Sequence, residues 1–291
     1  MKQFWFSVSV FVLRLTAALP YRLVGQFGCL LGALLYRIPS RRKRIVLINL
    51  QLCFPTQTLL ERDRLGSLHF QQVIRSYLER GVQWFGSAAK LDRLMQVESR
   101  IDLATIADTP TIFMGFHFVG IEAGCIYYST KFPVASLYTH MSDKEMCELA
   151  RQKRGRFGAK MIERSVSAKD SLRMLKRGVP VMLAADMDHG VQGSVFAPFF
   201  GVPACTLTSV SRMAKLGKAQ VVPFVTEVLP DFQGYKLTVF EPLANYPSND
   251  EAEDAAVMNR FLETQVSRLP DQYYWVHRRF KHRPVGEAMV Y

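Results

Sequence analysis

The sequence lacks several patterns that would place it in a common class of protein. Its five cysteines are scattered and form no C-x-x-C pair, which excludes a zinc ribbon or a disulfide framework and favours a reducing compartment. No G-x-S-x-G motif is present, so nothing indicates a nucleophilic serine on a strand-to-helix elbow. There is also no internal repeat, low-complexity segment or interdomain linker. The 291 residues are enough for one large domain or two small ones with a sizeable core.

Acidic residues are also few. The chain has 25 Asp and Glu against 37 Lys and Arg, which gives a formal net charge of +12. A basic surface suits nucleic acid, anionic lipid headgroups or phosphorylated ligands. Hydrophobic residues make up 49% of the chain, which is high for a soluble protein but far below the level of a polytopic membrane protein.

No apolar run is a clean membrane span of about 20 residues. Two shorter runs, residues 4–19 and 23–38, are separated by Pro20-Tyr-Arg22, and the basic cluster Arg41–Arg44 follows them. We expect residues 1–40 to form a helical membrane anchor, either tilted or a shallow hairpin, with the basic cluster on anionic headgroups and the rest of the protein on the cytoplasmic side. A buried helix pair of a soluble protein, with the cluster as a solvated helix end, is the alternative.

Beyond residue 57, helical and strand patterns alternate, which predicts an α/β fold. Two capping boxes, at Ser142–Glu145 and Ser248–Glu251, mark helix starts, the first of a helix that runs to about Phe157. The segment 235–240 alternates like an edge strand. Further predicted strands are 97–101, 111–116, 133–138, 160–163, 179–185 and 219–228, and predicted helices lie within 57–85 and at 168–176, 206–216 and about 251–269.

The most informative stretch is Thr111–Gly124. An apolar run ends at His117, and Glu122 follows five residues later. Positions five apart do not share a helix face, so the two side chains can meet only if a strand ends before His117 and a helix begins before Glu122. Histidine beside a carboxylate can deprotonate a hydroxyl, because the acid fixes its tautomer and stabilises its charged form. The alternative is a core histidine with a solvent-facing glutamate.

Other polar groups follow predicted strands or lie in loops. Arg164 ends a short strand in a position suited to a phosphate clamp, and Arg154 belongs to a basic run that is either a second anion contact or a solvated helix face. Asp186 and Asp188 follow a buried strand, where metal ligation is a weaker possibility. The segment 193–204 is too apolar for a linker and is either the wall of an oily pocket or a buried crossover. Residues 272–284 mix aromatic and basic side chains and suit either base stacking or a membrane interface.

Taken in order, these segments resemble the late-acting lipid A acyltransferases, the lauroyl- and myristoyl-transferases within the lysophospholipid and glycerophosphate acyltransferase superfamily. The resemblance covers nearly the whole chain and is carried by the oily N-terminus, Asn49-Leu50, Cys53-Phe-Pro55, His117 with Glu122, Ile162-Glu-Arg164, Asp186-x-Asp188, Phe196-x-Pro-Phe-Phe-Gly201, Val221-Val-Pro223 and Gln272-Tyr-x-Trp275-x-His277-Arg-Arg-Phe280. The apolar residues between His117 and Glu122 depart from the wider superfamily, and the third block lacks its Pro-Glu-Gly.

The resemblance implies a single catalytic acyltransferase domain, residues 41–291, with a mixed central sheet flanked by helices. It implies that His117 is a general base oriented by Glu122 and that the acyl chain passes directly from a thioester to a hydroxyl, with no cofactor and no metal. Acyl-carrier protein, or else acyl-coenzyme A, is the implied donor, and a glycolipid precursor of lipid A in the bacterial inner membrane is the acceptor. The remaining implied substrate contacts are phosphate binding by Arg164 and Arg154, organisation of the site by Asp186 and Asp188, and lining of the acyl channel by Phe196, Phe199 and Phe200.

Three rival functions remain at this point. One is an acyltransferase with another acceptor, such as an amino-acid lipid or a lysophospholipid. Another is a non-catalytic, membrane-associated lipid-binding protein. The third, a nucleic-acid binder, is motivated only by the net charge and the aromatic residues near the C-terminus, and we expect no nucleic-acid partner.

Overall fold

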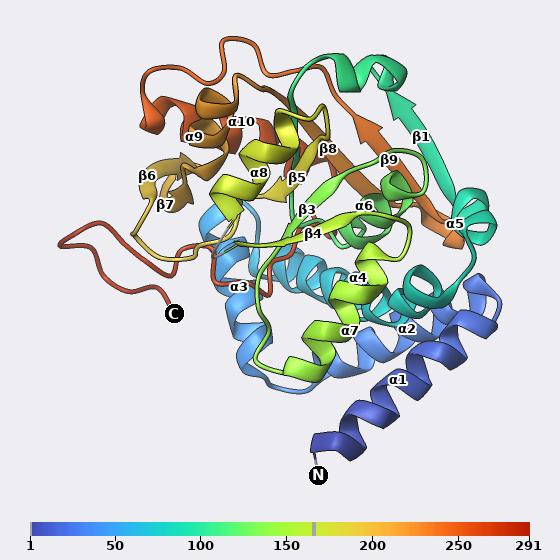
Figure 1. Ribbon diagram of the computed structural model, residues 1–291. Coiled ribbons are helices and arrows are strands. Elements are labelled where there is room, and N and C mark those ends of the chain that lie inside the picture. The colour runs from blue at the N-terminus through green and yellow to red at the C-terminus, as the bar shows by residue number, and fades with distance from the viewer. Residues whose placement is uncertain (1, 165–166) are drawn as a thin grey trace.

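The computed structural model describes residues 2–164 and 167–291, and it has an α/β fold (Figure 1). Seven strands form one mixed sheet in the order β1-β9-β8-β2-β5-β3-β4, in which every neighbouring pair is parallel except β8 with β9. A separate antiparallel hairpin is formed by β6 and β7. The strands are β1 (Met95–Ser99), β2 (Thr111–Gly115), β3 (Ala135–Tyr138), β4 (Lys160–Glu163), β5 (Val181–Ala184), β6 (Ser194–Phe199), β7 (Val202–Leu207), β8 (Gln220–Val228) and β9 (Tyr235–Val239).

Helices cover both faces of the sheet, because its central strands are apolar on both sides. On β2, Ile112 and Met114 belong to the core beneath α8, α9 and α10, whereas Phe113 packs on the opposite face with Tyr128 of α6. The helices in this part are α5 (Ala88–Leu94), α6 (Ile121–Ser129), α7 (Lys144–Gly155), α8 (Ser167–Leu175), α9 (Ser209–Gly217) and α10 (Glu251–Arg268), with 3-10 turns at Leu103–Asp108 and Pro230–Phe232.

The N-terminal part is a set of packed helices: α1 (Lys2–Ala18), α2 (Tyr21–Arg37), α3 (Arg41–Cys53) and α4 (Leu59–Phe85). Helix α1 lies along the lower edge of the molecule, and both α1 and α2 pack on α4 (Figure 1). Among the described residues, no single helix has both the length and the apolar composition of a membrane span. Only α2 and α3 taken together pass that test, and they are bent by 89°. The expected anchor at residues 1–40 therefore stays a prediction.

Most predicted elements are present, but three differ in their setting. The predicted helical region 57–85 is one helix, α4, which begins at Leu59 and is capped by Thr58, and the predicted loop at 193–204 is largely the β6–β7 hairpin. The expected edge strand, β9, lies inside the sheet, because the short strand β1 pairs with its outer side. The alternation of β9 indicates a half-buried strand but does not reveal that a segment 140 residues earlier covers its edge.

Candidate active site

His117 lies in the turn that joins β2 to α6, as its spacing from Glu122 predicts. Strand β2 ends at Gly115, and α6 begins at Ile121 with Glu122 in its first turn. The turn is held by the C-terminal segment, since the backbone N–H of Tyr274 donates to the His117 carbonyl over 2.9 Å. His117 therefore sits at the carboxyl end of a central parallel strand, where open α/β sheets place their ligands.

The carboxylate that contacts His117 belongs to Asp186, which follows the neighbouring strand β5. The Nδ1 atom of His117 lies 2.7 Å from Asp186 Oδ1, and the His117 backbone N–H donates to Oδ2 over 3.0 Å. Burial would raise the pKa of Asp186, but its contacts with His117, together with the charge of Arg279, lower that pKa. An ionised Asp186 favours a proton on Nδ1, which leaves Nε2 as the basic nitrogen.

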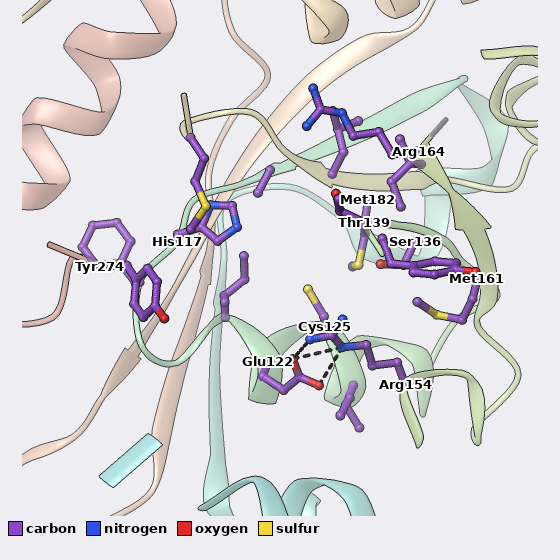
Figure 2. Close-up of a pocket in the computed structure, with 18 of the residues that line it drawn as sticks. His117, Glu122, Cys125, Ser136, Thr139, Arg154, Met161, Arg164, Met182 and Tyr274 are labelled. Carbon is purple, nitrogen blue, oxygen red and sulfur yellow. Dashed lines mark hydrogen bonds and ion pairs between the residues drawn. The ribbon is translucent and has the colours of Figure 1, made fainter. Parts of the chain in front are cut away.

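Glu122 is held elsewhere. Its carboxylate accepts hydrogen bonds from Arg154, 2.6 Å from Nη2 to Oε2 and 2.8 Å from Nε to Oε1 (Figure 2). It also accepts a hydrogen bond from the Trp84 indole over 2.7 Å. Burial would raise the pKa of Glu122, but Arg154, the charge of Arg80 and the Trp84 hydrogen bond lower it to about 2. Across the described parts of the chain, no hydrogen bond or ion pair joins Glu122 to His117. The expected contact between Glu122 and His117 is therefore not made, because the Glu122 carboxylate is hydrogen-bonded to Arg154 and Trp84 instead.

His117 and Glu122 both line a cavity of about 550 Å³ at the carboxyl ends of β2, β3, β4 and β5 (Figure 2). Arg154 and Arg164 contribute cationic side chains to it. Much of the rest of the wall is apolar and rich in methionine, an unbranched side chain that adapts to differently shaped ligands. The five methionines are Met141, Met161, Met182, Met187 and Met213.

Asp188 lies outside this cavity in a buried polar cluster. Its Oδ1 lies 2.6 Å from His282 Nδ1 and accepts from the Gly190 N–H, while Oδ2 accepts from the His282 N–H. Asp188, Cys205 and His282 place three possible metal-ligand atoms within 4.8 Å of one another. However, burial raises the pKa of the Cys205 thiol, whose Sγ is 3.3 Å from the Gly190 carbonyl oxygen. These contacts make the cluster a hydrogen-bonded clamp on the loop after β5.

The three phenylalanines expected along an acyl channel lie apart from the cavity. Phe199 is buried in the main core, Phe200 packs against that core, and Phe196 is exposed on β6. None of them is among the residues that line the cavity. Side chains alternate between the two faces of a strand, so Phe196 and Phe199 of β6 point to opposite faces. The segment forms a hairpin that packs on the core and is not part of the cavity wall.

The C-terminal aromatic segment is also part of the core. Tyr273, Trp275 and Phe280 are buried, and Arg279 is 1% exposed, with hydrogen bonds to the Cys205 carbonyl and the Thr206 hydroxyl. The Asn49 side-chain amide donates to the backbone carbonyls of Trp275 and His277. The base-stacking and membrane-interface interpretations are thus wrong for these three aromatic rings, which are buried in the main core.

Sequence reasoning missed two side chains near Glu122: Arg80, which lines the cavity, and Trp84, which donates a hydrogen bond to the glutamate. Both belong to the last turns of α4, far from the recognised motifs, and their helical pattern gives no sign that they reach the sheet. Only the packing of α4 against α6 brings them to Glu122.

An α/β sheet that holds a histidine–aspartate pair at its carboxyl edge, beside a largely apolar cavity, has the groups that an enzyme needs for proton transfer on an apolar substrate. The model of the bacterial lipid A biosynthesis acyltransferase family matches residues 1–282. The chain belongs to this family and is an acyltransferase.

Named relatives agree with this assignment. The lipid A biosynthesis lauroyltransferase of Escherichia coli K12 is 33% identical, over 99% of this chain and 95% of the relative. The palmitoleoyltransferase of the same organism is 32% identical, over 99% and 94%. Its myristoyltransferase is 25% identical, over 90% and 82%.

Proposed function

We propose that this enzyme transfers a fatty acyl chain from an acyl thioester to a hydroxyl group of a lipid A precursor. The observation that carries the proposal is the His117–Asp186 pair at the cavity, in a chain of this family. The named activities of the relatives, which differ in the acyl chain but share lipid A biosynthesis, support the choice of acceptor.

In this mechanism His117 is the general base. Its Nε2 takes the proton of the acceptor hydroxyl, whose oxygen attacks the thioester carbonyl. The C–S bond then breaks, and the imidazolium returns the proton to the departing thiolate. Asp186 orients the ring through Nδ1 and stabilises its charged form, the role that the sequence assigned to Glu122. The absence of a nucleophile elbow supports direct transfer without an acyl-enzyme.

The other cavity residues divide between the two substrates. Arg164 lines the cavity and is proposed to contact a phosphate of the glycolipid acceptor. Arg154 is neutralised by the buried Glu122, and this pair links α6 to α7 beside the base. The methionine-rich wall, in place of Phe196, Phe199 and Phe200, is proposed to hold the acyl chain. The mechanism needs no cofactor or metal.

The charge and the exposed surface of the protein support the proposed donor and the proposed location. The net charge of +12 suits an acidic acyl-carrier protein, with acyl-coenzyme A as the other thioester donor. We propose that the exposed apolar side chains of α1 and α2 enter the inner membrane from its cytoplasmic face, with Arg41–Arg44 on anionic headgroups.

The proposal is tested with purified protein, a panel of acyl-carrier-protein thioesters, and either a lipid A precursor or a lysophospholipid as acceptor. Mass spectrometry of the products should reveal acylation of the lipid A precursor. His117→Ala should lower kcat by about 10²–10⁴-fold, and Asp186→Asn should lower it by about 10²-fold with little change in KM. His140→Ala serves as the matched control, because this exposed histidine does not line the cavity. Acylation of the lysophospholipid alone would refute the acceptor, and full activity of His117→Ala would refute the base.

A further inference from the structure

Arg80 is a cationic side chain at the cavity to which the mechanism above assigns no role. It lies on α4, lines the same cavity as His117, and its guanidinium sits over the Tyr77 ring at 4.4 Å from the ring centroid. Within residues 2–164 and 167–291, no carboxylate forms an ion pair with it, whereas Arg154 is paired with Glu122. The charge of Arg80 lowers the pKa of Glu122, but the Glu122 oxygens accept their hydrogen bonds from Arg154 and Trp84. A guanidinium that faces a substrate cavity without a carboxylate bound to it is suited to an anionic group of the substrate, above all one that can accept two hydrogen bonds.

A second donor lies beside Arg80. The hydroxyl oxygens of Tyr77 and Tyr274 are 2.6 Å apart, so one of them donates its hydrogen to the other. The accepting hydroxyl keeps its own hydrogen, which is available to a further acceptor. Burial, followed by the contact with Tyr77, raises the pKa of Tyr274, so this side chain remains a protonated donor. Figure 2 places Tyr274 next to His117.

Arg80 and the Tyr77–Tyr274 hydroxyl pair are placed where either substrate could contact them. Arg80 and Tyr274 line the cavity, whereas Tyr77 does not line it and is 37% exposed, so the group extends from the cavity wall to the surface at the rim. Helix α4 also carries α1 and α2 with their exposed apolar side chains. The thioester arm of a carrier must pass a rim of the cavity to reach His117.

We propose that Arg80, together with the Tyr77–Tyr274 hydroxyl pair, binds a phosphate group of a substrate at the rim of the cavity. The inference rests on the proposed function, under which both substrates carry phosphate: the glycolipid acceptor on its sugar headgroup, and the donor on its pantetheine arm. A phosphate fixed there holds the reacting part of its molecule near Nε2 of His117, so the contact contributes chiefly to substrate binding.

The test compares the wild-type enzyme with Arg80→Gln, Arg80→Lys and Arg64→Gln. Arg64→Gln removes the same charge from an exposed position of α4 that does not line the cavity. Each enzyme is assayed with the bisphosphorylated lipid A precursor and its dephosphorylated counterpart, and with acyl-carrier-protein and acyl-pantetheine thioesters, the latter lacking the phosphate. Thermal melting of each variant controls for folding.

For Arg80→Gln, KM for the phosphorylated substrate should rise about 10- to 100-fold, the range expected for a lost charge-assisted contact, while kcat changes little. KM for the same substrate without phosphate should not change, Arg80→Lys should fall between, and Arg64→Gln should match the wild type. A rise in the acceptor KM assigns the phosphate to the glycolipid, and a rise in the donor KM assigns it to the pantetheine arm.

Equal KM values in wild type and Arg80→Gln, or an equal loss on substrates with and without phosphate, would refute the inference while leaving the proposed function intact. Failure of the wild type to acylate any acceptor would instead refute the proposed function. In that event, equilibrium binding of the bisphosphorylated glycolipid in detergent micelles still decides the role of Arg80. Weaker binding by Arg80→Gln than by Arg64→Gln supports the phosphate site. Equal binding of the glycolipid refutes its assignment to the acceptor, and equal binding of phosphopantetheine as well refutes the site.

Discussion

Two carboxylates beside one cavity are held in different ways. Asp186 is fully buried and contacts His117, whereas Glu122 is 9% exposed and is held by Arg154 and Trp84. The first arrangement keeps a base in one orientation. The second neutralises a guanidinium in the cavity wall, so removing the glutamate's charge would leave that guanidinium without its partner.

The Glu122–Arg154 pair predicts a pH-dependent contribution to stability. The pKa of Glu122 is lowered from 4.5 to about 2, so its contribution is fully present above pH 4.5 and is lost as the pH falls through 2. Glu122→Gln should therefore lower the free energy of unfolding by about 3 kcal/mol at pH 7, and the difference from wild type should shrink below pH 4. Urea unfolding of both proteins at pH 7, 5 and 3 measures this difference in the free energy of unfolding.

Glu148→Gln is the control for this measurement. The pKa of Glu148 is also lowered to about 2, by hydrogen bonds from Arg151 and Gln152, but this carboxylate lies on the surface. Solvent screens such a pair, so its replacement should change stability far less. A pH-independent difference for Glu122→Gln, or an equal effect of Glu148→Gln, would contradict the assigned role of the buried pair.

At the scale of the elements, α2 packs closely on α4. A Cβ atom at Gly32 would lie 2.5 Å from the Gln71 Cα and 2.6 Å from the Phe70 carbonyl oxygen, and one at Gly28 would lie 2.6 Å from the Arg75 Cα. Backbone atoms cannot yield as a flexible side chain can, so these glycines permit a helix crossing that any larger residue would force apart. Helix α2 is thus packed tightly on α4. A membrane anchor that was joined to the rest of the protein only through the chain would not require such packing.

Gly32→Leu tests this packing. A leucine improves intrinsic helix propensity by almost 1 kcal/mol relative to glycine, so a loosely attached α2 would be unaffected or stabilised. With the observed contact, we expect the free energy of unfolding to fall by about 1–3 kcal/mol and Tm to fall with it. Gln26→Leu introduces the same side chain on the exposed face of α2 and should leave Tm nearly unchanged. Equal Tm values for the two variants would contradict the close packing.

On the whole molecule, exposed apolar side chains concentrate on the N-terminal helices. Phe4, Trp5 and Phe11 on α1 are each at least 64% exposed, and Phe27 and Leu30 on α2 are close to 60%. The basic cluster Arg41–Arg44 begins the next helix. An apolar surface of this kind beside cationic side chains is typical of a helix pair that lies in a membrane interface.

We expect the protein to co-sediment with anionic phospholipid vesicles. Replacing Phe4, Trp5 and Phe11 with Ser should reduce the bound fraction several-fold, because each replacement removes apolar area from the contact. Raising the salt concentration should weaken binding only partly, because screening acts on the basic cluster but not on the apolar contact. Leu216→Ser, an equally exposed apolar position on α9, is the control. Unchanged binding by the triple variant would contradict the proposed membrane face.

The sequence by itself determined the elements around the active site. Alternation and helical spacing predicted the strand before His117, the helix that holds Glu122, and the alternating α/β order, because the side-chain periods of strands and helices are local properties. The ordered motifs also identified the family, since residue identities at fixed places do not depend on coordinates.

Only the tertiary structure decided which side chains meet. Asp186 contacts His117 across 69 residues because β5 pairs with β2, and Trp84 and Arg154 reach Glu122 because α4 and α7 pack on α6. No local pattern encodes the order of strands in a sheet or the partner of a helix, because both are set by how the apolar faces of the whole chain can be buried together. The same reason placed β9 inside the sheet and the phenylalanines of β6 away from the cavity.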